Sequence, residues 1–149
     1  MRLPTGFIAA ETSSPFPSHD PSAIGRLYIF TEEASNAIKM YYTDDEGGTV
    51  SVAVTVTGSG DDVSAAINPV GKRIVVYHHN NDLYRVIYDP QGNVITAASV
   101  IVTGGVNQGK TAVAWRLGTW YAYYRDGGNS LIQITSVSIV TGCGDNVPL

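Results

Sequence analysis

Charged residues and cysteine are scarce in this sequence. Charged side chains make up 15% of the 149 residues, whereas hydrophobic side chains make up 44%. A disordered chain needs high charge with low hydrophobicity, and a coiled coil needs many charges on its outer faces, so both classes are excluded. The single cysteine, Cys143, cannot form a disulfide within the chain.

Long apolar runs and clusters of basic residues are also missing. No apolar run approaches the about 20 residues of a membrane helix, and the N-terminus has no apolar stretch typical of a secretory signal. The nine Lys and Arg residues are scattered and the net charge is −4, whereas a phosphate-binding surface needs clustered cations. We expect a protein that is made in a cytoplasm without a signal peptide and binds neither nucleic acid nor membrane.

An internal repeat is the most informative feature that is present. The strand-like run at residues 26–30 recurs at residues 73–77 and 119–123, at spacings of 47 and 46 residues. A second run, residues 37–42, recurs at residues 83–88, again 46 residues later. Alternating apolar residues and many β-branched residues within these runs predict strands rather than helices.

Two further runs complete each unit. The third run ends in Thr-Gly at residues 57–58, 103–104 and 141–142, and a fourth run at residues 63–67 matches residues 111–115. Gly, Asn and Asp fill the segments between the runs, as hairpin turns require. The sequence therefore predicts an all-β domain over residues 21–149, with three tandem four-stranded antiparallel units of about 46 residues.

Tandem four-stranded units of this length resemble the blades of β-propeller proteins. The resemblance implies a propeller-like array, although the chain lacks the Trp-Asp pair and the glycine pairs that mark two well-known propeller families. A plain antiparallel β-sandwich is the alternative fold. Because a propeller needs at least four blades, three units predict closure between chains in an oligomer.

The first 20 residues lie outside the repeat and contain three of the seven prolines. Since proline cannot donate to a sheet ladder, we expect an extended arm rather than a central strand. This arm carries four apolar side chains that we expect to contact another subunit: Leu3, Phe7, Ile8 and Phe16.

Residues 104–111 match the glycine, lysine and threonine spacing of a phosphate-binding loop. Such a loop must open a helix, because the helix N-terminus holds the phosphates. The residues after Lys110 are short, β-branched and closed by glycine, so we interpret the stretch as a turn between strands. No nucleotide or other cofactor is expected.

Other reactive residues lack partners in the sequence. Residues 44–46 and 61–62 are acidic, but the spacing of a calcium loop is absent, which favours solvated turn carboxylates. The neighbouring His78 and His79 would point to opposite faces of a strand, and Cys143 has no histidine nearby. These patterns indicate neither a metal site nor catalytic residues, so we expect a protein that is not an enzyme.

Aromatic residues cluster on the expected strands, where alternate side chains face opposite sides. Exposed rings could bind a glycan, whereas buried rings would fill the space between blades. The candidates for ligand-facing rings are Tyr42, Tyr88, Trp115, Trp120 and Tyr124.

Low charge, abundant Val, Thr and Gly, an arm and open repeats are together typical of an assembly subunit. In overall character the chain resembles bacteriophage virion proteins of the tail, the neck or the capsid surface. The resemblance implies a structural role within a virion, with a homo-oligomer and other structural proteins of the particle as partners. A glycan-binding propeller-type lectin module is the alternative function.

Overall fold

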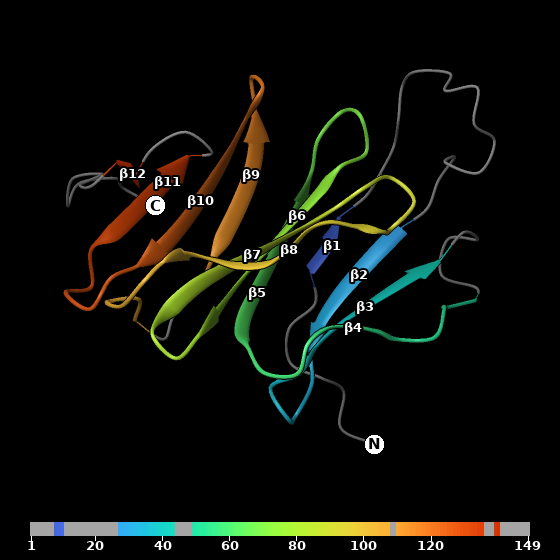
Figure 1. The fold of residues 1–149 in the computed structure, drawn as a ribbon, viewed down its shortest axis with the longest axis horizontal. Helices are drawn as coiled ribbons and strands as arrows, with labels where there is room; N and C mark the ends of the chain where they lie inside the picture. The colour runs from blue at the N-terminus through green and yellow to red at the C-terminus, as the bar shows by residue number, and fades with distance from the viewer. Residues whose placement is uncertain (1–7, 11–26, 44–48, 108–109, 136–138, 141–149) are drawn as a thin grey trace.

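The computed structural model describes residues 8–10, 27–43, 49–107, 110–135 and 139–140, and we restrict structural statements to them (Figure 1). All regular secondary structure in these residues is β-strand. The described part of the chain therefore contains no helix that could cross a membrane.

Twelve strands form three four-stranded antiparallel sheets, each with its strands in chain order. The first sheet contains β1 (Ile8–Ala10), β2 (Leu27–Glu32), β3 (Ile38–Thr43) and β4 (Val54–Thr57). The middle sheet contains β5 (Asp61–Ile67), β6 (Arg73–His79), β7 (Asp82–Tyr88) and β8 (Val94–Val102). The third sheet contains β9 (Ala112–Arg116), β10 (Thr119–Arg125), β11 (Leu131–Thr135) and β12 (Ile139–Val140). The predicted all-β class is confirmed, and the strands form three antiparallel sheets, although not in the grouping that the repeat predicts.

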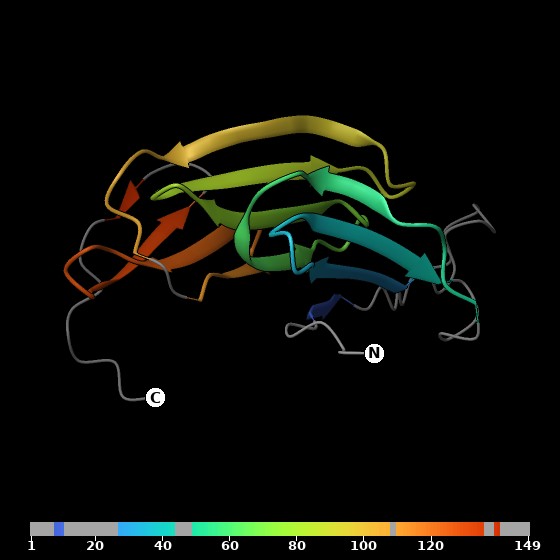
Figure 2. The ribbon, with the colours of Figure 1, turned by 90° about the horizontal axis from the view of Figure 1, so that it is seen from below.

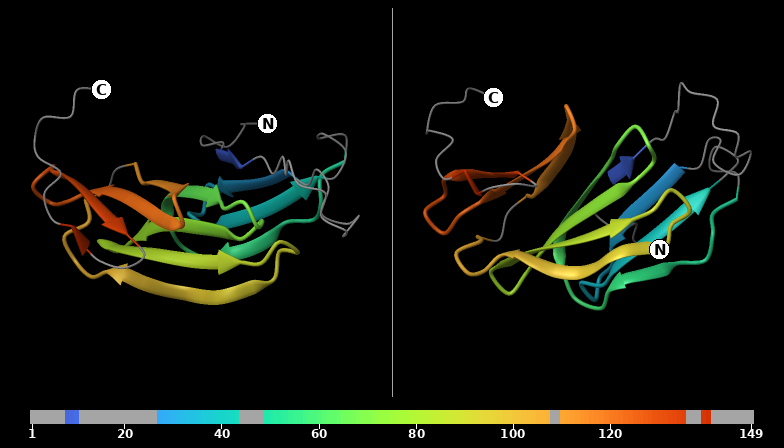
Figure 3. Two further views of the ribbon diagram at one scale, coloured as in Figure 1. Left: turned by 90° about the horizontal axis from the view of Figure 1, so that it is seen from above. Right: turned by 45° about the horizontal axis from the view of Figure 1, so that its top comes forward.

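The middle sheet lies between the other two (Figures 1 and 3). Its first strand, β5, contacts β1 and β2 of the first sheet and β9 of the third sheet. In the view of Figure 2, the fourth strand β8 runs along the upper margin of the molecule, and β1 lies at the lower side. The first strands of the three sheets are thus neighbours.

The sequence repeat correctly identified the strands that occupy the same position in each of the three sheets. The runs at residues 26–30, 73–77 and 119–123 fall on β2, β6 and β10, which are the second strands of three different sheets. The grouping of the fourth run was wrong, because β5 and β9 each begin the following sheet. The reason is local: a hairpin loop returns the chain from β5 directly onto β6, so β5 pairs forward rather than with β4.

Four of the hairpins share one loop conformation. In each five-residue loop the first N–H donates to the fifth carbonyl at 2.9–3.0 Å, and the fourth N–H donates to the first carbonyl at 2.9–3.1 Å. The fourth residue has a positive φ, which glycine and asparagine adopt at least cost. These fourth residues are Asn36, Gly71, Gly92 and Asn129.

Two hydrophobic cores lie between the sheets. The first core joins the first and middle sheets and contains Tyr28, Phe30, Ile38, Met40, Val63, Val75, Tyr77, Val86 and Tyr88. The second core joins the middle and third sheets and contains Val76, Leu83, Val106, Ala122, Tyr124, Ile132 and Ile134. The strand β6 contributes to both cores, which explains its almost continuous run of buried residues.

Candidate functional site

Two of the candidate ligand-facing rings belong to the cores instead. Tyr88 is 2% exposed in the first core and Tyr124 is 7% exposed in the second. Burial is also the main cause that raises the pKa of each phenol. The prediction that these rings face a ligand is corrected, because they fill the space between sheets. Tyr42 is half-buried against the first core, with its ring centroid 5.9 Å from that of Tyr28.

Trp115 and Trp120 form a pair at the end of the β9–β10 hairpin. They stand directly opposite each other, their ring centroids are 4.7 Å apart and their planes meet at 65°. Both rings are half-buried. The connecting turn places Leu117 at φ 48° with 88% of the residue exposed. This hairpin end therefore presents apolar side chains to solvent.

The N-terminal segment that we expect to be an arm includes a strand. Ile8–Ala10 forms β1 and pairs with β2, so these three residues belong to the first sheet. Leu3, Phe7 and Phe16 lie outside the described residues. The subunit contact predicted for them and for Ile8 stays a prediction.

The stretch that matches a phosphate-binding loop joins β8 to β9. Gly104 and Gly105 have positive φ angles, and the chain after Lys110 enters β9 rather than a helix, as the sequence predicts. The Lys110 side chain is 92% exposed, and its Nζ lies 3.4 Å from Asp62 Oδ1. This geometry is that of a connection between sheets.

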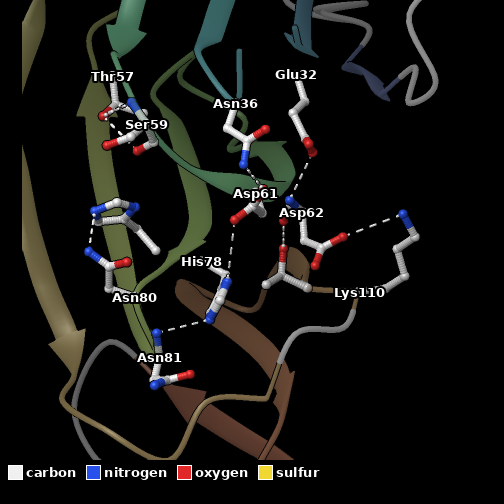
Figure 4. A network of polar contacts seen from close by, with 12 residues as sticks. Glu32, Asn36, Thr57, Ser59, Asp61, Asp62, His78, Asn80, Asn81 and Lys110 are labelled. Carbon is white, nitrogen blue, oxygen red and sulfur yellow. Dashed lines mark hydrogen bonds and ion pairs between the residues drawn. The ribbon is translucent and has the colours of Figure 1, made fainter. Parts of the chain in front are cut away.

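A polar network around the start of β5 links all three sheets (Figure 4). The Asp62 N–H donates to Glu32 Oε2 of the first sheet at 3.1 Å. The Asp62 carbonyl accepts from Thr111 Oγ1, just before β9, and Thr111 Oγ1 lies 3.1 Å from Ser64 Oγ. The acidic pair at residues 61–62 is thus part of a bulged strand, and its prediction as solvated turn carboxylates is corrected.

His78 extends this network into the middle sheet. Its Nε2 accepts the Asn81 N–H at 3.2 Å, and its Nδ1 lies 3.9 Å from Asp61 Oδ2. Asp61 Oδ1 in turn accepts from Asn36 Nδ2 at 2.8 Å. Across the residues described by the structure, no three His, Cys, Asp or Glu side chains are placed to hold a metal. The network holds the sheets together.

The third sheet also has a face that points away from the middle sheet. Because Ala122 and Tyr124 point into the second core, the alternate residues of β10 point outward. Strand pairing places the neighbours of these residues on the same side. We call this surface the outer face of the third sheet; it contains Ala112, Ala114, Tyr121, Tyr123, Arg125, Leu131, Gln133 and Thr135. Tyr121 and Tyr123 were missed as candidates, and strand alternation beside a buried Tyr124 is the signal that could have identified them.

The first sheet has a corresponding outer face. Tyr28 and Phe30 point into the first core, so their neighbours on β2 point away from it. By strand register, the outer face of the first sheet contains Leu27, Ile29, Thr31, Lys39, Tyr41 and Thr43, of which Thr31 and Thr43 are buried. The Tyr41 hydroxyl donates to Glu33 Oε1 at 3.3 Å, and burial followed by the Glu33 charge raises the pKa of Tyr41.

Comparison with known proteins adds no assignment: no protein-family model matches the chain, and no curated protein matches it.

Proposed function

We propose that this protein is a non-enzymatic structural subunit that works by assembling with further copies of itself. The observation that carries the proposal is the unequal covering of the three sheets. Within the described residues, the middle sheet packs against a neighbour on both faces, whereas the first and third sheets each pack on one face. The end sheets carry apolar and aromatic residues on their outer faces, and such surfaces are typical of interfaces.

The arrangement of the sheets supports a propeller-like assembly. Consecutive four-stranded sheets follow one another along the chain, and β5 contacts the first strands of both neighbouring sheets. Propeller blades surround a central axis with their first strands, and at least four blades are needed to close the ring. We therefore propose that each chain supplies three blades and that further copies supply the others.

A bacteriophage virion is the setting that we propose for this subunit. Low charge and the abundance of glycine and β-branched residues support this setting, because in overall character the chain resembles tail, neck and capsid-decorating proteins. The other structural proteins of the particle would then be its further partners.

Glycan binding is the second candidate function. The half-buried Trp115–Trp120 pair supports it, because flat aromatic rings stack on the apolar faces of sugars. A single pair at a hairpin end would suit a shallow site rather than an enclosed pocket.

The mass of the purified full chain, measured by light scattering behind size-exclusion chromatography, tests the proposed function. We expect a species of at least two chains. A monomer at every concentration would contradict the proposal. Binding to a glycan array that is lost in Trp120→Ala, in a chain that stays monomeric, would favour the second candidate instead.

A further inference from the structure

The β9–β10 turn projects from the third sheet and presents a leucine to solvent (Figures 1 and 3). Leu117 is 88% exposed and has a φ of 48°, a left-handed conformation that is unfavourable for leucine. The fold therefore gains little from this side chain, whose apolar surface is available for a contact outside the chain.

A second apolar tip lies at the same end of the molecule. The loop that joins β5 to β6 also points toward the top in Figure 1, and its Val70 is 67% exposed. Asn68 holds this loop in place, because its Oδ1 accepts the Val70 N–H at 3.2 Å and the Lys72 N–H at 2.8 Å. The exposed valine is thus presented by a loop of fixed conformation.

The two tryptophans of the chain lie directly behind the leucine. Arg116 and Thr119 pair next to the turn, and Trp115 and Trp120 form the following strand pair with half-buried rings. Indole rings combine an apolar body with a polar N–H, and they are enriched where water meets the hydrocarbon of a bilayer.

The charge around both tips is positive. Arg116 and Lys72 flank the tips and are exposed, and residues 63–81 and 90–125, which include both tips, contain no Asp or Glu. The neighbouring β7–β8 loop has Asp89, whose carboxylate accepts two hydrogen bonds within that loop. Exposed cations that flank apolar tips attract a negatively charged surface.

We propose that these two loop tips bind the surface of a membrane that contains anionic lipids. Leu117 and Val70 enter the outer part of the hydrocarbon, the tryptophan rings lie at the level of the headgroups, and Arg116 and Lys72 contact lipid phosphates. The inference goes beyond the proposed assembly and does not depend on it. The missing apolar run, on which the expectation of no membrane binding was based, excludes a spanning helix but not loop tips that enter only the interface.

A lipid surface fits these tips better than a glycan or a protein does. Residues 112–124 of the hairpin contain no Asp, Asn, Glu or Gln, the side chains that commonly bind sugar hydroxyls. A specific protein–protein interface buries at least about 1,200 Å², which is far more than a few loop side chains supply. A bilayer needs no matching pocket, so separate tips can enter it side by side.

The test uses the full chain and vesicles of equimolar phosphatidylcholine and phosphatidylglycerol. Because Trp115 and Trp120 are the only tryptophans, tryptophan emission reports on this hairpin alone. Brominated lipids quench the emission of rings that enter the bilayer, co-sedimentation gives the partition coefficient, and thermal melting reports the fold.

Two variants each remove one apolar tip, Leu117→Asn and Val70→Asn. The matched control is Val100→Asn, because Val100 is 42% exposed on β8, where it pairs with Tyr84 away from both loops. Asparagine is a preferred residue in the β9–β10 turn, so Leu117→Asn keeps the test decisive even if the Val70 variant unfolds.

We expect vesicles to shift the emission to shorter wavelengths, brominated lipids to quench it, and each folded tip variant to partition about tenfold less than the unaltered chain. The control should partition like the unaltered chain, and vesicles of phosphatidylcholine alone should bind less. Emission that vesicles leave unchanged, or a folded Leu117→Asn variant that partitions normally, would overturn the lipid contact. An emission shift with soluble sugars but not with vesicles would also overturn it and would favour glycan binding.

Discussion

The guanidinium of Arg73 lies over the ring of Tyr28, with Arg73 Cζ 3.5 Å from the ring centroid. This contact joins β6 of the middle sheet to β2 of the first sheet. Arg73 is 1% exposed and its Nη2 donates to the Asp89 carbonyl, while the Tyr28 hydroxyl donates to the Pro90 carbonyl at 3.3 Å. The buried guanidinium of Arg73 thus connects Tyr28 of the first sheet with the loop that follows β7 in the middle sheet.

Replacing this cation should weaken the packing between the two sheets. Arg73→Met keeps much of the side-chain volume but removes the cation–π contact and the hydrogen bond to Asp89. We expect a loss of about 2–4 kcal/mol in the free energy of unfolding, measured by urea denaturation. Lys72→Met, at the neighbouring exposed position, is the control and should change stability by no more than about 0.5 kcal/mol. Equal effects at the two positions would show that the buried contact contributes nothing.

Stability at alkaline pH should depend on Tyr88. Burial, followed by the neighbouring Tyr77, raises the pKa of Tyr88 from 10.0 to about 12. The unfolded phenol loses its proton from about pH 10 upward, whereas the folded phenol keeps it until about pH 12. The stabilisation that the protonated Tyr88 phenol gives to the folded state is therefore complete below about pH 10. It is lost as the pH rises from about 10 through about 12.

The Tyr88→Phe variant isolates this contribution, because it cannot ionise at that position. We expect the unaltered chain to lose stability relative to the variant between about pH 10 and about pH 12, as followed by urea denaturation at a series of pH values. A constant difference between the two proteins over that range would contradict the burial of the phenol.

The sequence was sufficient to predict the strands and their repetition, because alternation and turn residues act locally. The runs on β2, β6 and β10 were matched correctly from their residue types alone. The grouping into sheets was not predicted, since pairing of β5 with β6 depends on the loop at residues 68–72 and on contacts between sheets.

The candidate surfaces were harder to predict than the strands. The burial of Tyr88 and Tyr124 depends on which side of a strand meets the neighbouring sheet, and one residue of register reverses that choice. The polar network around Asp62 joins residues that are far apart in the sequence, from Glu32 to Thr111, so no local pattern indicates it.

In the connection before β9, the stability of the protein should depend on Thr111 but hardly on Lys110. Lys110→Ala removes an exposed ion pair with Asp62, which should change stability by no more than about 0.5 kcal/mol. Thr111→Val removes a buried hydroxyl that bonds the Asp62 carbonyl and contacts Ser64, and should cost about 1–2 kcal/mol. Chemical denaturation of the two variants checks both values. ATP binding that is lost in Lys110→Ala would contradict the interpretation of this stretch as a turn.

The turn between β9 and β10 should become more stable when its leucine is replaced. Leu117 adopts φ 48°, a left-handed conformation that is strained for leucine. Because the residue is 88% exposed, burial of its side chain does not offset this strain. Asparagine followed by Gly118 is the preferred pair for a two-residue hairpin turn. We expect Leu117→Asn to raise the free energy of unfolding by about 1 kcal/mol. An unchanged or lower melting temperature would show that Leu117 is held by contacts of its own.

Hydroxyl-radical footprinting of Leu131 tests the central claim most directly, because it reports on one side chain of the outer face of the third sheet. Labelling is measured by mass spectrometry for the full chain at low and at high concentration, with the exposed Leu117 as the internal reference. If the chain is an assembly subunit, labelling of Leu131 falls severalfold at high concentration while that of Leu117 stays constant. Labelling of Leu131 that does not change with concentration, in a chain that remains monomeric, would contradict the account.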